Sequence, residues 1–337
     1  MSVITKRRLG VNGLRSPIPI HEDRVHAMAL IPQFIHDSIA PALVEACALH
    51  GLDLEVPRVR REDYPTLVQR VDNLITWGMK HPASFYHELG ANTLFIENGL
   101  LSQRNNISIF TEGYFADSDL CINREYEQPA TQPEVRQIYA IVRDRFGWDM
   151  FAGGDPAGPI LYAIQRSSDM PCQFYFPGNN MGYDSIEAGL RIAARHLNKE
   201  VVWIRPHPRF HNEWDMLEPK YRSYFGPGWS VHKDGSIYDL LPKCSALITI
   251  NSTVATEALS LGLPVATLGH STYTGAHVTW ECADNTDLLH LHRYHTPNRA
   301  AVWNYLAAVL RHQLPVSASP QQIANNVSFR RWIERIK

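Results

Sequence analysis

The feature of this sequence that most constrains its fold is a repeated alternation of short apolar runs with helical patterns. In the first half, "RVHAMALI" precedes "HDSIAPALVEACALHG", "NLITWG" precedes "PASFYHELGA", and "TLFIENG" follows. A strand followed by a helix, repeated along a chain, predicts parallel βαβ units. A further strand is expected over "ISIFTEGYF" and a helix over "PEVRQIYAIVRDRFG", with Pro133 in the first turn of that helix and Gly147 at its end.

The alternation restarts after residues 151–170, which are rich in Gly, Pro and Ser. Strands are expected over "CQFYFPGNN", "EVVWIRPHP", "GWSVHK", "ALITINS" and "PVATLG", with helices over "YDSIEAGLRIAARHLN", "SIYDLLPKC" and "TVATEALSLG". A chain of 337 residues suits two domains of roughly 150 residues each. The sequence therefore predicts an α/β protein with two Rossmann-like domains that face each other across an interdomain cleft. The first domain is expected over residues 1–150 and the second over residues 171–315, with a linker over 151–170. A final helix over 316–337 is expected to pack back near the junction.

Charge and cysteine usage narrow the class of protein. A formal net charge of −2 gives no overall attraction to nucleic acid, so any anion must be held by local groups. Five cysteines lie far apart without a CxxC pair, which argues against a disulfide framework and a structural zinc site and indicates a reducing compartment. We expect a cytoplasmic protein. The basic amphipathic stretch "FRRWIERIK" leaves two alternatives open, a packed helix or peripheral contact with an anionic membrane.

Polar residues gather where the predicted strands end. Ligands in open α/β sheets bind beyond the carboxyl ends of the strands. Five of the predicted strands end in polar residues or glycine there, namely Glu97 with Asn98, the loop 177–184, His207, the segment 251–253, and Gly269.

The stretch "ITINSTVATEALSLGLPV" predicts a nucleotide site. A buried strand delivers Asn251, Ser252 and Thr253 to a helix start, where N–H groups and the helix dipole favour a phosphate. The alternative is an ordinary N-cap, which Ser and Thr also favour. Glu257, one turn into the helix, is suited to accept hydrogen bonds from ribose hydroxyls.

His207 stands between Pro206 and Pro208, and the two prolines restrict the backbone around it. The alternative is a proline turn with a solvent-facing imidazole. Because His207 follows a neighbouring strand of the same domain, we expect it to donate a hydrogen bond to the same phosphate as the helix start.

Several acidic and histidine patterns have competing interpretations. Asp184 begins "DSIE", which fits a helix capping box, and Glu97 follows a buried strand, where a carboxyl group can act as a general acid or base or simply start a turn. Asp117 and Asp119 form a D-x-D pattern that could hold a metal, and three histidines follow at 290, 292 and 295. Acidic pairs are common in loops and no regular ligand spacing accompanies the histidines, so no metal is expected.

Six stretches in order resemble the bacterial capsule-polysaccharide glycosyltransferases that add β-linked Kdo with retention of configuration. They span residues 70–280 and are "ITWGMK", "FIENGLLS", "TEGYFAD", "FPGNNMGYDSI", "IRPHP" and "INSTVATEALSLGLPVATLGHSTYTG". The resemblance implies a GT-B fold with an N-terminal acceptor domain and a C-terminal CMP-binding domain, CMP-Kdo as the donor, a glycan or glycolipid acceptor, and no metal.

The resemblance also implies residue roles. Asp184 falls on the family's nucleophile and Glu97 on its general acid/base, while His207 falls on the His-Pro motif at the CMP phosphate. Ser252 and Thr253 match its hydroxyl pair at the same phosphate. Asn179 and Arg205 stand where the family has Gln and Lys and are expected at the nucleotide.

Other departures bear on specificity. Asn98, Leu100 and Ser102 stand where the family shows Asp, Phe and Arg, and Ala276 with His277 where it shows Trp-Gly. The absent Arg leaves acceptor choice and recognition of the sugar carboxylate open, so a related CMP-linked acidic sugar is an alternative donor. Two other functions also stay open, a CDP-glycerol or polyol-phosphate transferase of the teichoic-acid type and a non-catalytic scaffold of capsule assembly.

Overall fold

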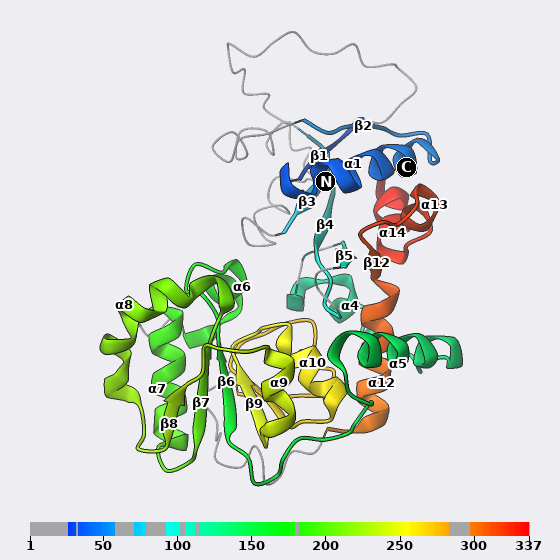
Figure 1. Cartoon of the computed structure of the whole chain (residues 1–337). Coiled ribbons are helices and arrows are strands. Elements are labelled where there is room, and N and C mark those ends of the chain that lie inside the picture. The colour runs from blue at the N-terminus through cyan, green and yellow to red at the C-terminus, as the bar shows by residue number, and fades with distance from the viewer. Residues whose placement is uncertain are drawn as a thin grey trace, which may run out of the picture.

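The computed structural model describes residues 26–31, 33–57, 71–78, 92–101, 105–111, 113, 115–178, 182–282 and 297–336 (Figure 1). Within these residues the chain forms two six-stranded sheets, each in its own α/β domain. The α/β class and the two sheet domains expected from the sequence are therefore confirmed. Among the same residues, no helix is both long enough and apolar enough to cross a membrane.

The first domain has the strand order β12-β5-β4-β3-β1-β2. Its parallel strands are β1 (His26–Leu30), β2 (Asp53–Glu55), β3 (Asn73–Trp77) and β4 (Asn92–Asn98), and α1 (Gln33–Ala48) connects β1 to β2. β5 (Asn106–Phe110) runs antiparallel to β4, and β12 (Gln313–Pro315) runs antiparallel to β5. The helix expected over "PASFYHELGA" lies outside the described residues.

The second domain has the order β11-β10-β9-β6-β7-β8, and all its strands are parallel. The strands are β6 (Ile160–Ile164), β7 (Val202–Pro206), β8 (Trp229–Val231), β9 (Ala246–Thr249), β10 (Val265–Thr267) and β11 (Trp280–Glu281). The helices are α6 (Met170–Tyr175), α7 (Ser185–Leu197), α8 (His211–Tyr221), α9 (Ile237–Leu240) and α10 (Val254–Leu261). Buried apolar runs form the central strands, as expected for a parallel sheet covered on both faces.

Two elements differ from the sequence-based expectation. The segment 151–170, expected as a linker, contains β6, which lies between β9 and β7 in the middle of the second sheet. The run "CQFYF", expected as a strand, lies mostly within helix α6, which begins after Asp169 with Pro171 in its first turn. Short apolar runs fit both element types, and here the proline at the helix start settles the choice.

The C-terminal segment returns to the first domain. α12 (Arg299–Arg311) packs against α5 (Gln132–Phe146) and the short turn η3 (Glu125–Glu127), and β12 then joins the first sheet. α13 (Pro320–Ala324) packs on α1, and α14 (Val327–Ile336) packs on β4 and β5. Residues 313–336 therefore belong to the first domain, so the boundary expected at residue 315 falls at the end of a strand of the first sheet.

Helix α14 contains the basic stretch that the sequence left between two interpretations. Its apolar side chains Phe329 and Trp332 are fully buried, and Trp332 Nε1 donates to Asn92 O at 3.0 Å. The apolar face is covered by the first sheet, which confirms the interpretation as a packed helix.

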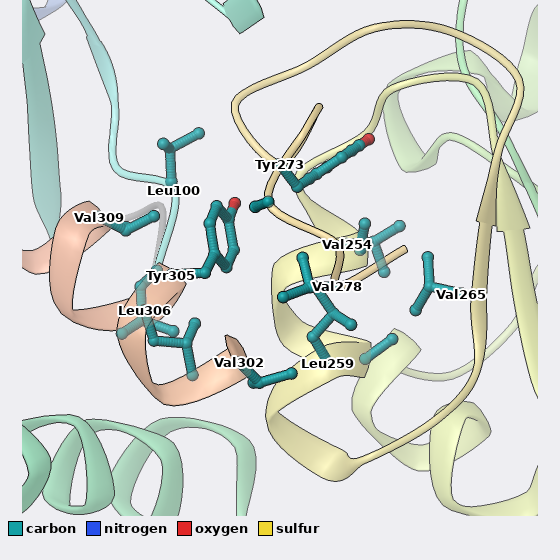
Figure 2. Packing of buried hydrophobic residues seen from close by; sticks show 14 of the residues in the cluster. Leu100, Val254, Leu259, Val265, Tyr273, Val278, Val302, Tyr305, Leu306 and Val309 are labelled. Carbon is teal, nitrogen blue, oxygen red and sulfur yellow. The ribbon is translucent and has the colours of Figure 1, made fainter. Parts of the chain in front are cut away.

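One hydrophobic cluster joins the two domains. It contains Phe95 and Leu100 of the first domain, Val254 and Val265 of the second, and the buried face of α12. Figure 2 shows α12 facing α10, with Tyr305 directed toward the loop that carries Tyr273. Since apolar burial stabilises roughly in proportion to area, this shared core holds the two domains together.

Candidate functional site

Three adjacent strands of the second sheet end at one place. β6 lies between β7 and β9, and the three strands are parallel, so their carboxyl ends meet at the same edge. The chain continues there into His207 after β7, Gln165 and Arg166 after β6, and Ser252 after β9. With one strand between them, the axes of β7 and β9 lie roughly 9.5 Å apart, a gap that a phosphate-sized anion and its ligands can span.

His207 is held with one ring nitrogen facing its own backbone. Its Nδ1 accepts a hydrogen bond from the backbone N–H of Arg209 at 3.1 Å. In the neutral imidazole the proton is then on Nε2, which is a donor. Burial lowers the pKa of His207, Asp169 opposes this, and the positive charges of Arg209 and Arg166 lower it further. The ring is therefore a neutral hydrogen-bond donor, carried by a backbone segment that the two flanking prolines restrict.

The start of α10 carries the two hydroxyls expected at a phosphate. Ser252 and Thr253 are both partly exposed, and Thr253 occupies the N-cap position. The Oγ of Ser252 accepts from the backbone N–H of Val254 at 3.4 Å, which is a long contact. The N–H groups of the first helical turn lie beside these two partly exposed residues.

Asn251 is bound within the protein. Its side chain is fully buried, accepting from Gln165 Nε2 at 3.0 Å and donating to the carbonyl of Pro171 at 2.8 Å. Gln165 Oε1 in turn accepts from the backbone N–H of Asn251 at 2.9 Å. This amide pair ties the ends of β6 and β9 to the start of α6, and the contact of Asn251 with a nucleotide stays a prediction.

Arg205 is also used inside the protein. Its buried guanidinium donates to the carbonyls of His232 at 2.9 Å, Asp234 at 3.0 Å and Gly235 at 2.6 Å. Three carbonyls in one loop satisfy most of its donors. Arg205 therefore fixes the loop after β8 to β7, and its contact with a nucleotide stays a prediction.

Glu257 lies on α10 among apolar neighbours and is 5% exposed. Burial raises the pKa of its carboxyl to about 7, and a hydrogen bond from the hydroxyl of Tyr238 at 3.1 Å opposes that rise. The carboxyl is thus poised between its two protonation states near neutral pH, one turn from Ser252.

Asp184 is the N-cap of α7, as the capping pattern indicated. Its carboxylate accepts from the backbone N–H of Glu187 at 2.9 Å, from the hydroxyl of Tyr221 at 3.1 Å, and from Lys220 Nζ at 3.4 Å. The side chain keeps 35% exposure. Three donors converge on one carboxylate that still faces solvent.

Glu97 lies near the end of β4 in the first domain and is partly exposed. Its Oε1 accepts from the backbone and the side-chain amide of Asn98, both at 2.8 Å. Asp184 and Glu97 thus stand on different domains with separate partners. Asn179, expected at the nucleotide, lies outside the described residues.

A contact between the domains involves one acid of the D-x-D pattern. Asp117, at the end of the turn η2 (Phe115–Asp117), accepts a hydrogen bond from the hydroxyl of Tyr175 on α6 at 2.6 Å. The ring of Tyr175 also packs against Phe115, and Cys121 Sγ lies 3.2 Å from the carbonyl of Thr272. No sequence pattern indicates this partner for Asp117, because the contact joins residues 58 positions apart in separate domains.

The other acid of that pattern is buried elsewhere. Asp119 accepts from Ser328 Oγ at 2.9 Å and from Arg331 Nη1 at 3.0 Å, and Arg331 also pairs with Glu125. His312 Nε2 lies 2.9 Å from Glu125 Oε2. These two carboxylates and the imidazole are close enough to hold an ion. The guanidinium of Arg331 already supplies the positive charge, so the cluster acts as a brace that holds α14 against Asp119 and Glu125 within the first domain.

Comparisons with known proteins agree with this architecture. Residues 154–313 match the family "Capsule polysaccharide biosynthesis protein". Protein FixF of Sinorhizobium fredii is 30% identical over 116 residues, which cover 34% of this chain and 27% of that protein.

Two solved structures of Thermosulfurimonas dismutans KpsC have a similar fold. The β-Kdo 2,7 transferase is 16% identical with a TM-score of 0.58, covering 93% of this chain and 98% of its own. The β-Kdo 2,4 transferase is 15% identical with a TM-score of 0.50, covering 86% and 91%. The likeness confirms the GT-B-type fold expected from the sequence. Residues 154–313, the segment that matches the capsule polysaccharide biosynthesis protein family, carry both His207 and the start of α10.

Proposed function

We propose that this protein is a retaining glycosyltransferase that moves Kdo, or a related acidic sugar, from its CMP derivative to a glycan or glycolipid acceptor in capsule or surface polysaccharide synthesis. One observation carries the proposal: the neutral His207, with Nε2–H as donor, stands at the same sheet edge as the hydroxyl-bearing start of α10. The family match over this domain and the KpsC-like fold support it.

In the proposed reaction, the CMP phosphate is bound between His207 and the start of α10. The carboxylate of Asp184 attacks the anomeric carbon, the bond from that carbon to the phosphate oxygen breaks, and CMP leaves with the electron pair. Donors fixed in advance at the phosphate stabilise the charge that develops there. Glu257 is proposed to accept hydrogen bonds from the ribose hydroxyls.

In the second step the acceptor hydroxyl attacks the same carbon and releases Asp184, while Glu97 takes the hydroxyl proton. Two inversions at one carbon give net retention, as in retaining glycosidases. Because Asp184 and Glu97 stand on different domains, the donor sugar is proposed to bind between the two domains. Asp117, the carboxylate at the contact between the domains, is the alternative nucleophile.

Intact-protein mass spectrometry after incubation with CMP-Kdo tests donor, chemistry and residue together. The wild type should gain the mass of one Kdo, and Asp184→Asn should not. Asn is a good N-cap, so this variant keeps α7 capped while removing the nucleophile. The reaction is proposed to need no metal, and the adduct should form equally in EDTA.

Further variants and substrates, tested in parallel, distinguish the proposed mechanism from its alternatives. An adduct that persists in Asp184→Asn and disappears in Asp117→Asn would move the nucleophile to Asp117 and leave the function standing. Turnover of CDP-glycerol without a sugar adduct would replace the proposal with a polyol-phosphate transferase. Binding of neither CMP nor CDP in calorimetry would indicate a non-catalytic scaffold.

A further inference from the structure

Arg166 lies at the centre of the candidate site, although no sequence motif pointed to it. It follows β6, the strand between His207 on β7 and the start of α10 after β9. Its guanidinium turns toward the β7 side, because Nη2 lies 3.5 Å from Glu213 Oε1 in the first turn of α8. The positive charge of Arg166 is also close enough to His207 to lower the pKa of that imidazole, after the larger effect of burial.

Two buried nitrogens in this region are unsatisfied. Within the part of the chain that the structure describes, Arg166 Nε and His211 Nε2 are shielded from solvent and have no hydrogen-bond partner. The contact of Arg166 with Glu213 is at the limit of hydrogen-bond length, and both side chains are partly solvated, at 33% and 51% exposure. The partly exposed Asp169 uses Oδ2 to accept from the backbone N–H of Arg166 at 3.2 Å. The guanidinium of Arg166 thus combines a long contact with one exposed carboxylate and a shielded Nε that lacks a hydrogen bond.

The donor class in the proposed function has a second negative group beside its phosphate. In a 2-ulosonic acid the anomeric carbon bears both the phosphate oxygen and a carboxylate, so a single carbon separates the two anions. A phosphate bound between His207 and the start of α10 would place this carboxylate next to the phosphate, within reach of the strand end between them. A planar guanidinium matches a carboxylate in a fork of two hydrogen bonds.

We infer that Arg166 binds the carboxylate on the anomeric carbon of the donor and so selects CMP-linked 2-ulosonic acids over donors without that group. The inference rests on the proposed function. It supplies the cation that the sequence lacks at position 102, where the resembling family has Arg and this chain has Ser.

The test compares Arg166→Met and Arg166→Lys with the wild type, using steady-state kinetics with CMP-Kdo and calorimetry with CMP, which has no sugar carboxylate. Arg166→Met should raise KM for CMP-Kdo about tenfold or more, since charge-assisted hydrogen bonds are lost, while the Kd for CMP changes by no more than about twofold. Arg166→Lys should lie between the two, because an ammonium keeps the charge and loses the fork.

Arg209→Met is the matched control. It removes an equal charge from an exposed side chain nearby and keeps the backbone N–H that His207 accepts. Equal effects of Arg209→Met and Arg166→Met on KM would overturn the inference in favour of a general field effect. If Arg166→Met weakened the binding of CMP and of CMP-Kdo equally, the inference would be overturned in favour of a contact between Arg166 and the phosphate. Unaltered kinetics of a folded Arg166→Met, judged by its thermal midpoint, would refute the inference alone, whereas a wild type that binds neither ligand would refute the proposed function.

Discussion

Glu257 combines a polar side chain with an environment that disfavours its charge. Only Tyr238 among its described partners donates to the carboxylate, and burial raises the carboxyl pKa from 4.5 to about 7. A carboxyl whose pKa is higher in the folded than in the unfolded protein holds its proton more tightly when folded. Its stabilising effect is complete below the unfolded pKa and is lost as the pH rises through the folded pKa.

Glu257→Gln should therefore flatten the pH dependence of stability. The shift from 4.5 to about 7 corresponds to about 3 kcal/mol, which the wild type should lose between acidic and mildly alkaline pH and the variant should keep. Urea unfolding at several pH values measures it. Glu334→Gln, on an exposed side chain, is the control and should follow the wild type. If the free energy of unfolding of Glu257→Gln and of the wild type changed with pH in the same way, the raised pKa of Glu257 would be contradicted.

At the scale of single residues, the sequence predicts positions better than roles. His207 lies where the Pro-His-Pro pattern places it, with a defined tautomer. Asn251 and Arg205 also lie at the expected strand ends, yet both turn inward and bind the protein's own polar groups. An amide or guanidinium suits a backbone carbonyl as well as a ligand, and only the surrounding chain decides between them.

Among the elements, α14 adds an ionic contact with two buried acids to its apolar packing on the first sheet. Arg331 reaches Asp119 and Glu125, two acids that have almost no solvent exposure. Removing the cation would leave both carboxylates buried beside each other. Breaking such a cluster by deleting one partner is more costly than an exposed ion pair suggests, because the remaining charges stay desolvated.

Arg331→Met should lower the free energy of unfolding of the first domain by about 2–4 kcal/mol, a range reduced for the partial exposure of Arg331. Arg330→Met on the same helix is the matched control, because that side chain is exposed, and it should stay within about 0.5 kcal/mol of the wild type. Thermal unfolding followed by tryptophan fluorescence reports both. Equal midpoints for the two variants would show that the cluster is not a brace.

The elements that the sequence predicted wrongly share a cause. β6 is only five residues long and is bordered by Gly, Pro and Ser, so its apolar run was masked by turn-forming neighbours. α6 contains an apolar, aromatic run that fits a strand, and its assignment as a helix depends on Pro171 and on the packing around Asn251. Longer amphipathic elements such as α5 and α7, with clear caps, were predicted within a few residues.

For the whole molecule, the contact between Tyr175 and Asp117 is the direct polar link from the candidate site to the opposite domain. At 2.6 Å it is a short hydrogen bond to a carboxylate, a class that contributes more than a neutral bond. The shared hydrophobic cluster holds the domains at α12, which leaves this bond to influence how they close near the strand ends.

Tyr175→Phe should shift the domains toward a more open arrangement, by about tenfold in the ratio of closed to open molecules. Small-angle scattering or interdomain fluorescence transfer without ligand measures the shift. Tyr139→Phe is the control, since its hydroxyl donates to Asp149 at 2.8 Å on the exposed surface. An unchanged distribution in Tyr175→Phe would show that closure is set by the apolar contacts alone.

The position of β12 has a consequence for how this protein is made. A strand synthesised after the whole second domain pairs with β5 and covers what would otherwise be an open edge of the first sheet. During translation, β5 is synthesised early, and more than 200 further residues must be added before β12 is available to pair with it. Maturation of the N-terminal half is thus coupled to completion of the C-terminal half, and a ribosome that stalls in between releases an exposed strand ready to pair with a neighbour.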